Sequence, residues 1–233
     1  MNTDEPTMNT DAPKPEPSPA PVDYCAEIKR AIALASEPVY MSLYAMPGRL
    51  PDAEPSGPFA TYRAALESLR DDVQRHLDET AEGADDPDAF DDETDGADFC
   101  AALHAIDTEL AAIDNGTDDG YGAANGAYFG DAGGYAYEIV RVEDADRPHF
   151  TIGPVNIDDG APTVTLSHTA RSDWEARDIV WSTGSIAGSM LDRDGSGVYV
   201  VVDARRIAEA ARDLRDGCGA RLVADADAKD GER

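Results

Sequence analysis

Residues 58–79 have the sequence PFATYRAALESLRDDVQRHLDE, and this stretch decides the first half of the fold. Its apolar side chains recur at alternating three- and four-residue spacing, while the charged side chains lie off that stripe. The pattern predicts an amphipathic helix, in which Ser56 is a candidate N-cap and Pro58 suits the first turn. The stripe consists of Phe59, Tyr62, Leu66, Leu69 and Val73.

A second helix of the same kind is predicted over residues 96–114, with Asp95 as its cap and Asn115-Gly116 as its end. We expect the two helices to form an antiparallel hairpin, joined by an acidic loop over residues 80–95. An earlier helix, over residues 22–36, is separated from this hairpin by the Pro/Gly-rich stretch 47–58. The second stripe consists of Phe99, Leu103, Ile106, Leu110 and Ile113.

Strand patterns replace helical ones after residue 134. Ser172 and Glu175 have the spacing of a capping box, and Asp203 is expected to cap a helix that ends at Gly217, before a short strand at 222–223. The sequence therefore predicts an α+β protein: an N-terminal helical hairpin module, then a mostly antiparallel sheet with a packed C-terminal helix. The other expected strands cover residues 135–142, 149–152, 163–166, 179–182 and 198–202.

Composition divides the chain into five predicted segments. The alternating prolines of the first segment favour an extended polyproline conformation, and the glycines of the third suit a flexible linker or a pair of tight turns. The segments are a disordered tail (1–21), a helical module with an acidic loop at 78–98 (22–114), a Gly-rich linker or turns (115–134), a β-rich α+β domain (135–224) and a disordered tail (225–233).

Charge is concentrated in one window. Between Arg75 and Arg141 there is no lysine or arginine, but there are 18 aspartates and glutamates. This window therefore supplies -18 of the formal net charge of -29. Such a block repels nucleic acid and membrane phosphates and attracts basic protein surfaces. The chain uses 3 lysines against 16 arginines, which indicates a salt-adapted or GC-rich microbe. Direct binding of nucleic acid is not expected, because the one cluster of arginines, on the last helix, is interleaved with acids.

The location expected from the sequence is cytoplasmic. The N-terminus has no cationic start followed by an apolar run, and no stretch of 18 apolar residues could cross a membrane. Cys25, Cys100 and Cys218 are odd in number and far apart, which indicates reduced thiols instead of disulfides.

A short motif near the C-terminus resembles a calcium loop of the EF-hand or dockerin type. Asp192, Asp194 and Ser196 stand at positions 1, 3 and 5, a glycine stands at position 6, and Asp203 stands at position 12. The same residues also suit an ordinary hairpin turn before a strand. No cofactor is expected from the sequence, with calcium at this loop as the alternative, and both interpretations stay open at this point.

Other residues that could carry chemistry form incomplete sets. His76, Cys100 and His104 could meet at one end of the hairpin as zinc ligands, or could be a thiol and two histidines with no shared role. Ser167 and His168 are adjacent and point to opposite faces of a strand, so they cannot pair as nucleophile and base. Trp174 and Trp181 are expected in the core or at its edge. No complete catalytic signature is present.

These observations favour a non-catalytic protein that binds a basic protein partner. A nucleic-acid-binding protein offers the strongest complementary charge, so one version is a nucleic-acid mimic of the anti-restriction or anti-CRISPR type. Two alternatives remain: the acidic loop is only a solvated spacer, or residues 121–224 form a small metal-binding or enzymatic domain that uses the Asp192–Asp203 loop. The expected partner-binding residues are Asp85, Asp86, Asp88, Asp91, Asp92, Glu93 and Asp95.

The charge window predicts that stability rises with salt. Repulsion among about 18 like charges opposes compaction until counter-ions screen it. We expect the melting temperature to increase as KCl is raised from low to molar concentration, followed by circular dichroism. A melting temperature that stays flat or falls would contradict both the clustered-charge and the salt-adaptation interpretations.

Overall fold

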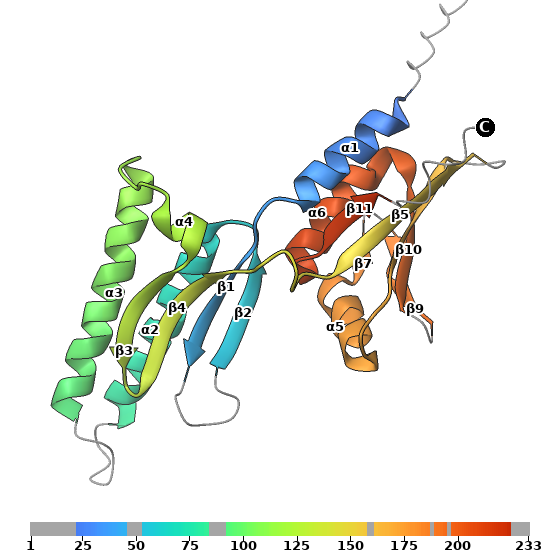
Figure 1. Ribbon diagram of the computed structural model, residues 1–233. Helices are drawn as coiled ribbons and strands as arrows, with labels where there is room; N and C mark the ends of the chain where they lie inside the picture. Colours follow the sequence, from blue (N-terminus) through green and yellow to red (C-terminus); the bar gives the residue numbers. More distant parts are fainter. Residues whose placement is uncertain are drawn as a thin grey trace, which may run out of the picture.

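The structure is a computed structural model that describes residues 22–45, 53–83, 92–157, 161–186, 189–194 and 197–224. Within these ranges the chain forms six α-helices and two main sheets, arranged as two units side by side (Figure 1). The α+β class predicted from the sequence is confirmed.

The first unit is a four-stranded antiparallel sheet in the order β2-β1-β4-β3, covered on one face by a helical hairpin. The hairpin helices are α2 (Tyr62–Gly83) and α3 (Asp92–Asp114). Their apolar stripes share a core with the sheet, in which Leu66, Phe99 and Tyr137 are fully buried. The remaining elements are β1 (Tyr40–Ala45), β2 (Ala53–Phe59), α4 (Tyr121–Asn125), β3 (Ala127–Ala132) and β4 (Tyr135–Arg141).

The second unit is a mixed five-stranded sheet in the order β11-β5-β6-β10-β9, in which β11 alone runs parallel to its neighbour. It shares one core with three helices, α1 (Tyr24–Ala35), α5 (Asp173–Thr183) and α6 (Ile207–Cys218), and α6 packs against α1. The strands are β5 (His149–Asn156), β6 (Thr163–His168), β9 (Asp192–Arg193), β10 (Val198–Asp203) and β11 (Arg221–Ala224); the short β7 (Ser185–Ile186), β8 (Ser189–Met190) and η1 (Ala204–Arg206) complete the unit.

The strands β1 and β2 of the first unit were not predicted. In β1 the side chains that face the core include Ser42, while Met41 and Leu43 point to the other face, so no apolar–polar alternation marks the strand. β2 contains Pro55 and Pro58, which a sheet tolerates at its edge. Because Ser56 and Pro58 belong to this strand, their predicted roles at the start of α2 are wrong.

The first hairpin helix is instead capped at Thr61, whose Oγ1 accepts a hydrogen bond from the backbone nitrogen of Ala64 at 3.1 Å. α3 begins at Asp92, three residues before its predicted cap Asp95, so that prediction is also wrong. Residues 179–182, expected as a strand, continue α5, because Ala176 and Ile179 form its buried stripe.

Two segments pack in other parts of the structure than the sequence suggested. α1 was expected beside the hairpin, yet its Ala31 and Ala35 lie in the core of the second unit. Residues 115–134, expected as a linker or turns, contribute α4 and β3 to the first unit. Gly133 and Gly134 form the tight β3–β4 turn with φ of 57° and 79°, a left-handed conformation that favours glycine.

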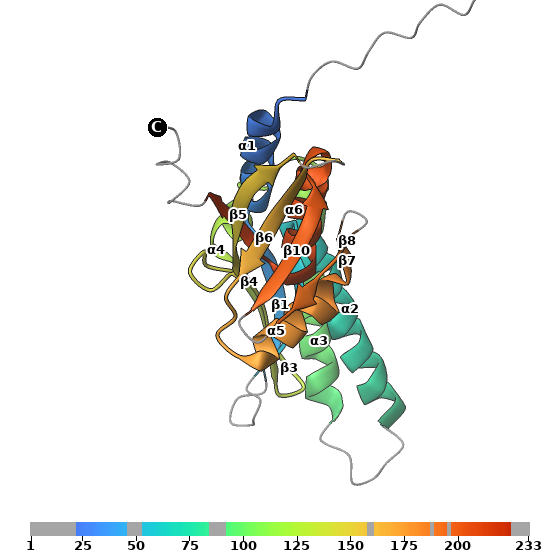
Figure 2. The same cartoon turned by 90° about the vertical axis from the view of Figure 1, so that its right-hand side faces the viewer.

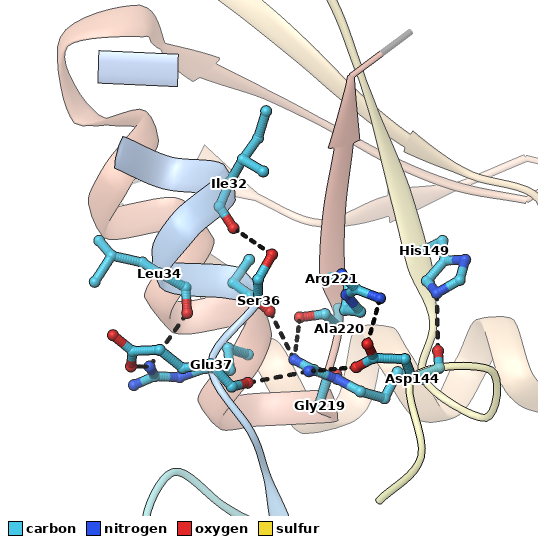
Figure 3. A network of polar contacts seen from close by, with 12 residues as sticks. Ile32, Leu34, Ser36, Glu37, Asp144, His149, Gly219, Ala220 and Arg221 are labelled. Carbon is cyan, nitrogen blue, oxygen red and sulfur yellow. Dashed lines mark hydrogen bonds and ion pairs between the residues drawn. The ribbon is translucent and has the colours of Figure 1, made fainter. Parts of the chain in front are cut away.

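The chain crosses between the units twice, at residues 36–39 and 142–148, and Arg147 lies at the junction. Its side chain is 1% exposed. Its guanidinium donates to the carbonyl oxygens of Ala35 (2.7 Å), Glu37 (3.0 Å), Gly219 (2.6 Å) and Ala220 (3.3 Å). One buried side chain therefore links both crossings to the end of α6. The accepting residues Glu37, Gly219 and Ala220 are labelled in Figure 3.

Charged neighbours complete this junction. Burial lowers the pKa of Arg147, and Asp144, 3.4 Å from Nη1, opposes that shift. Asp144 also pairs with Arg221 at 2.8 Å, and the nearly buried Arg215 pairs with Glu37. Gly219 has a φ of 69° and ends α6 in a left-handed turn, which aims the carbonyls of this turn at Arg147.

We expect Arg147→Met to lower the free energy of unfolding by about 3 kcal/mol or more, because buried carbonyl oxygens from three segments lose their donor. Urea denaturation followed by circular dichroism would measure the change. Arg206→Met is the matched control, since Arg206 is half-exposed and pairs with the exposed Glu209; it should change stability by about 0.5 kcal/mol or less. Equal effects for the two variants would show that Arg147 does not hold the junction.

Candidate partner-binding surfaces

The two hairpin helices are joined by ion pairs at one end. Arg63 of α2 pairs with Asp114 of α3, and Arg70 pairs with Asp107 at 2.6 Å. The two arginines are seven residues apart along α2, and their two partners are seven residues apart along α3. The earlier arginine pairs with the later aspartate, as an antiparallel pair of helices requires. Both pairs lie toward the start of α2 and the end of α3.

The remaining base of the hairpin is also engaged. Arg75 pairs with Asp72 at 2.5 Å and with Glu79 at 3.8 Å, and its guanidinium lies 5.9 Å from the centre of the Tyr44 ring. No lysine or arginine follows before Arg141. The end where α2 and α3 approach their connection is therefore acidic without a basic residue of its own.

This acidic end, residues 78–98, contains all seven predicted partner-binding residues. Asp85, Asp86, Asp88 and Asp91 lie outside the described residues. The backbone of Asp92, Glu93 and Asp95 lies in the first turns of α3. Asp78, Glu79 and Asp98 are exposed. In both views this end of the hairpin lies opposite α1 (Figures 1 and 2).

The proposed zinc ligands do not come together. His76 is buried against the sheet, where its Nδ1 lies 2.6 Å from the hydroxyl of Tyr137 and its ring stacks on Tyr135. Burial raises the pKa of Tyr137, so this phenol keeps its proton at neutral pH. Cys100 and His104 are exposed on α3. Among the described residues, no group of three metal-ligating side chains is positioned to hold an ion.

The predicted calcium motif forms a hairpin between β9 and β10. Asp194 and Gly197 close the turn, while Ser196 lies outside the described residues. Asp192 pairs with Tyr199, four residues from Asp203, so about 13 Å of strand separates the two carboxylates. Hydrogen bonds from Arg205 lower the pKa of Asp203 to about 2. Asp203 therefore cannot share an ion with Asp192 here, because calcium ligands lie about 2.5 Å from the metal.

Helix α5 exposes two tryptophans. Its predicted capping residue is present: Ser172 Oγ accepts from the backbone nitrogen of Glu175 at 3.1 Å. Trp174 is 80% exposed and Trp181 is 90% exposed, so the prediction that they pack in the core or at its edge is wrong. Ala176 and Ile179 face inward and set the phase of the helix, which turns both tryptophans outward. This apolar stripe is the signal in the sequence that could have found them.

A cleft of about 490 Å³ lies at the junction of the two units. Met41 and Pro58 line it from the first unit, and Asp178 and Cys218 line it from the second. Burial raises the pKa of Cys218 to about 12, and its Sγ lies 3.2 Å from the carbonyl oxygen of Leu214. The thiol is thus protonated at neutral pH and is not an activated nucleophile.

Comparison of the chain with protein-family models, with curated proteins and with solved structures found no match. Within the ranges that the structure describes, none of the helices is both long and apolar enough to cross a membrane.

The environment of Cys218 predicts how the three thiols react. A pKa of about 12 leaves about one Cys218 thiol in 10⁴ ionised at pH 8, and only the thiolate is alkylated. We expect iodoacetamide to label the exposed Cys25 and Cys100 in the native protein, and to label Cys218 at least about a hundredfold more slowly. Peptide mass spectrometry over time would measure the rates, with urea-unfolded protein as the control. Equal native rates would contradict the packing of Cys218 at the junction.

Proposed function

We propose that this protein is a non-catalytic, acidic binding protein, and that the acidic end of the α2–α3 hairpin engages a basic surface on a protein partner. The observation that carries the proposal is a run of eleven carboxylates without a basic residue, set largely on two antiparallel helices. α2 extends to Gly83 and α3 begins at Asp92, which leaves residues 84–91 between them. The eleven are Asp78, Glu79, Glu82, Asp85, Asp86, Asp88, Asp91, Asp92, Glu93, Asp95 and Asp98.

The helices supply the regular spacing that an acidic surface needs. Side chains three and four positions apart on a helix lie about 5–6 Å from each other. Glu79 and Glu82 stand three positions apart in α2, and so do Asp92 and Asp95 in α3. Acids carried on helical backbone give up less conformational entropy on binding than acids on an irregular segment do.

Helix stability does not account for the last acid of α2. The last turn contains Glu82 and no basic residue, while Glu79, one turn earlier, pairs with Arg75. A negative charge near a helix C-terminus opposes the helix dipole and costs about 0.3–1 kcal/mol at low ionic strength. Residues that destabilise their own helix are more simply explained by a role outside the fold. The acids that open α3 lie at its N-terminus, where the dipole favours them.

A protein that itself binds nucleic acid is the partner class with the greatest charge complementarity. Its groove presents clustered lysines and arginines to phosphates, and a carboxylate surface can occupy the same field. The proposed role is therefore that of a competitor for such a groove, as in a nucleic-acid mimic. Attraction of this kind acts mainly on the association rate and on specificity.

We expect the variant Asp85→Asn, Asp86→Asn, Asp88→Asn to bind an immobilised polyarginine peptide with an association rate about tenfold lower than that of the parent, and with a weaker dependence on salt. The same variant should capture fewer nucleic-acid-binding proteins from a lysate, and duplex DNA should compete with the parent for them. Surface plasmon resonance and mass spectrometry would measure the two effects.

The matched control is Asp131→Asn, Glu143→Gln, Asp146→Asn. These three residues are exposed and lie outside the hairpin, and the variant loses the same number of charges. It should bind as the parent does. If the two variants lose binding equally, the interaction senses only net charge, and the acidic end is a solvated spacer.

A further inference from the structure

Helix α5 presents an unpartnered face that is independent of the acidic hairpin. Four exposed residues, Trp174, Arg177, Asp178 and Trp181, follow one another at helical spacings of three, one and three. They lie on one side of the helix and are called here the tryptophan face. The same four, with Val180 and Arg193, line a hollow of about 570 Å³. An apolar surface of this kind, bounded by charges, is typical of a protein–protein contact.

The order of residues on this face is self-complementary. Read along the helix it is aromatic, cation, anion, aromatic; read in the opposite direction it is aromatic, anion, cation, aromatic. We propose that a second copy of this chain occupies the face, and that two α5 helices pack antiparallel about a two-fold axis between Arg177 and Asp178. In such an interface each contact occurs twice, because residue i meets residue j and residue j meets residue i.

This arrangement pairs each side chain with a suitable partner. Trp174 of one copy lies against Trp181 of the other, and Arg177 lies against Asp178. A parallel arrangement would place each charge against its own kind, so the charges select the antiparallel one. Within one chain Arg177 pairs with Asp173 at 2.9 Å, but both side chains are more than half exposed, so little holds that pair together. Asp173 keeps Arg193 as a second partner.

The area available fits a weak dimer. A tryptophan can bury about 150–250 Å². Four of them, together with the stems of the arginines, would bury on the order of 1,000 Å², near the lower limit for a specific interface. The net charge of -29 on each copy opposes association, so self-association should strengthen as salt screens this repulsion.

Sedimentation velocity of the full chain at about 0.3 M KCl, from about 1 to about 200 µM, tests the proposal, since this range spans weak association. We expect the 24.8 kDa chain to approach twice its mass as concentration rises. Trp174→Ser with Trp181→Ser should weaken self-association at least about tenfold. The control is Tyr128→Ser, which removes an aromatic residue that is 59% exposed on the other unit, and it should have no effect.

Charge reversal tests the two-fold arrangement itself. Arg177→Asp alone and Asp178→Arg alone each place like charges in contact, and each should weaken self-association about tenfold. The double variant Arg177→Asp, Asp178→Arg restores opposite charges in reverse order, and it should recover the parent's association to within about threefold. Circular dichroism would confirm that each variant is folded.

Three results would overturn the proposal. The parent could remain a monomer over the whole range, or the double tryptophan variant could associate as the parent does. Alternatively, the double charge reversal could fail to recover what the single reversals lose, which would show that the face does not meet a second copy of itself in this orientation.

Discussion

The buried guanidinium of Arg147 is the interaction on which the arrangement of the two units depends. It donates to carbonyl oxygens at the end of α1, in the first crossing and in the turn after α6, and it belongs to the second crossing itself. A buried cation is costly unless its donors are satisfied, so each of these segments is held where it can accept. The chain can therefore place α1 in one unit and β1, five residues after α1 ends, in the other.

This junction explains why the second unit is discontinuous in sequence. Its core takes Ala31 and Ala35 from α1 and the other residues from β5 onward, with the whole first unit inserted between them. The two ends of the inserted unit lie next to each other, because Tyr40 at the start of β1 pairs with Arg141 at the end of β4. The first unit can consequently extend its hairpin away from the junction without disturbing the core of the second.

The two candidate surfaces are separated in the same way. The acidic end is on the first unit, beyond Arg75, the last basic residue of the hairpin, and the tryptophan face is on α5 of the second unit. Binding at the proposed acidic end would depend on long-range charge and be sensitive to salt, while binding at the proposed tryptophan face would depend on apolar area and short-range pairing. A dimer formed through α5 would present two acidic ends, and a partner with two basic sites would bind it with increased avidity.

The sequence by itself determined what depends on local periodicity: the stripes of α2 and α3, the N-cap at Ser172, the strand after Asp194 and the acidic window. The tertiary structure alone decided what depends on partners far along the chain. β1 is apolar on both faces, so only its pairing with β2 and β4 makes it a strand. Nothing in the sequence around Arg147 distinguishes it from the other arginines, and only the fold brings four carbonyl oxygens within hydrogen-bonding distance of its side chain. The exposure of Trp174 and Trp181 follows from which side of α5 meets the core, a choice made by packing against α6 and the sheet and not by the hydrophobicity of tryptophan.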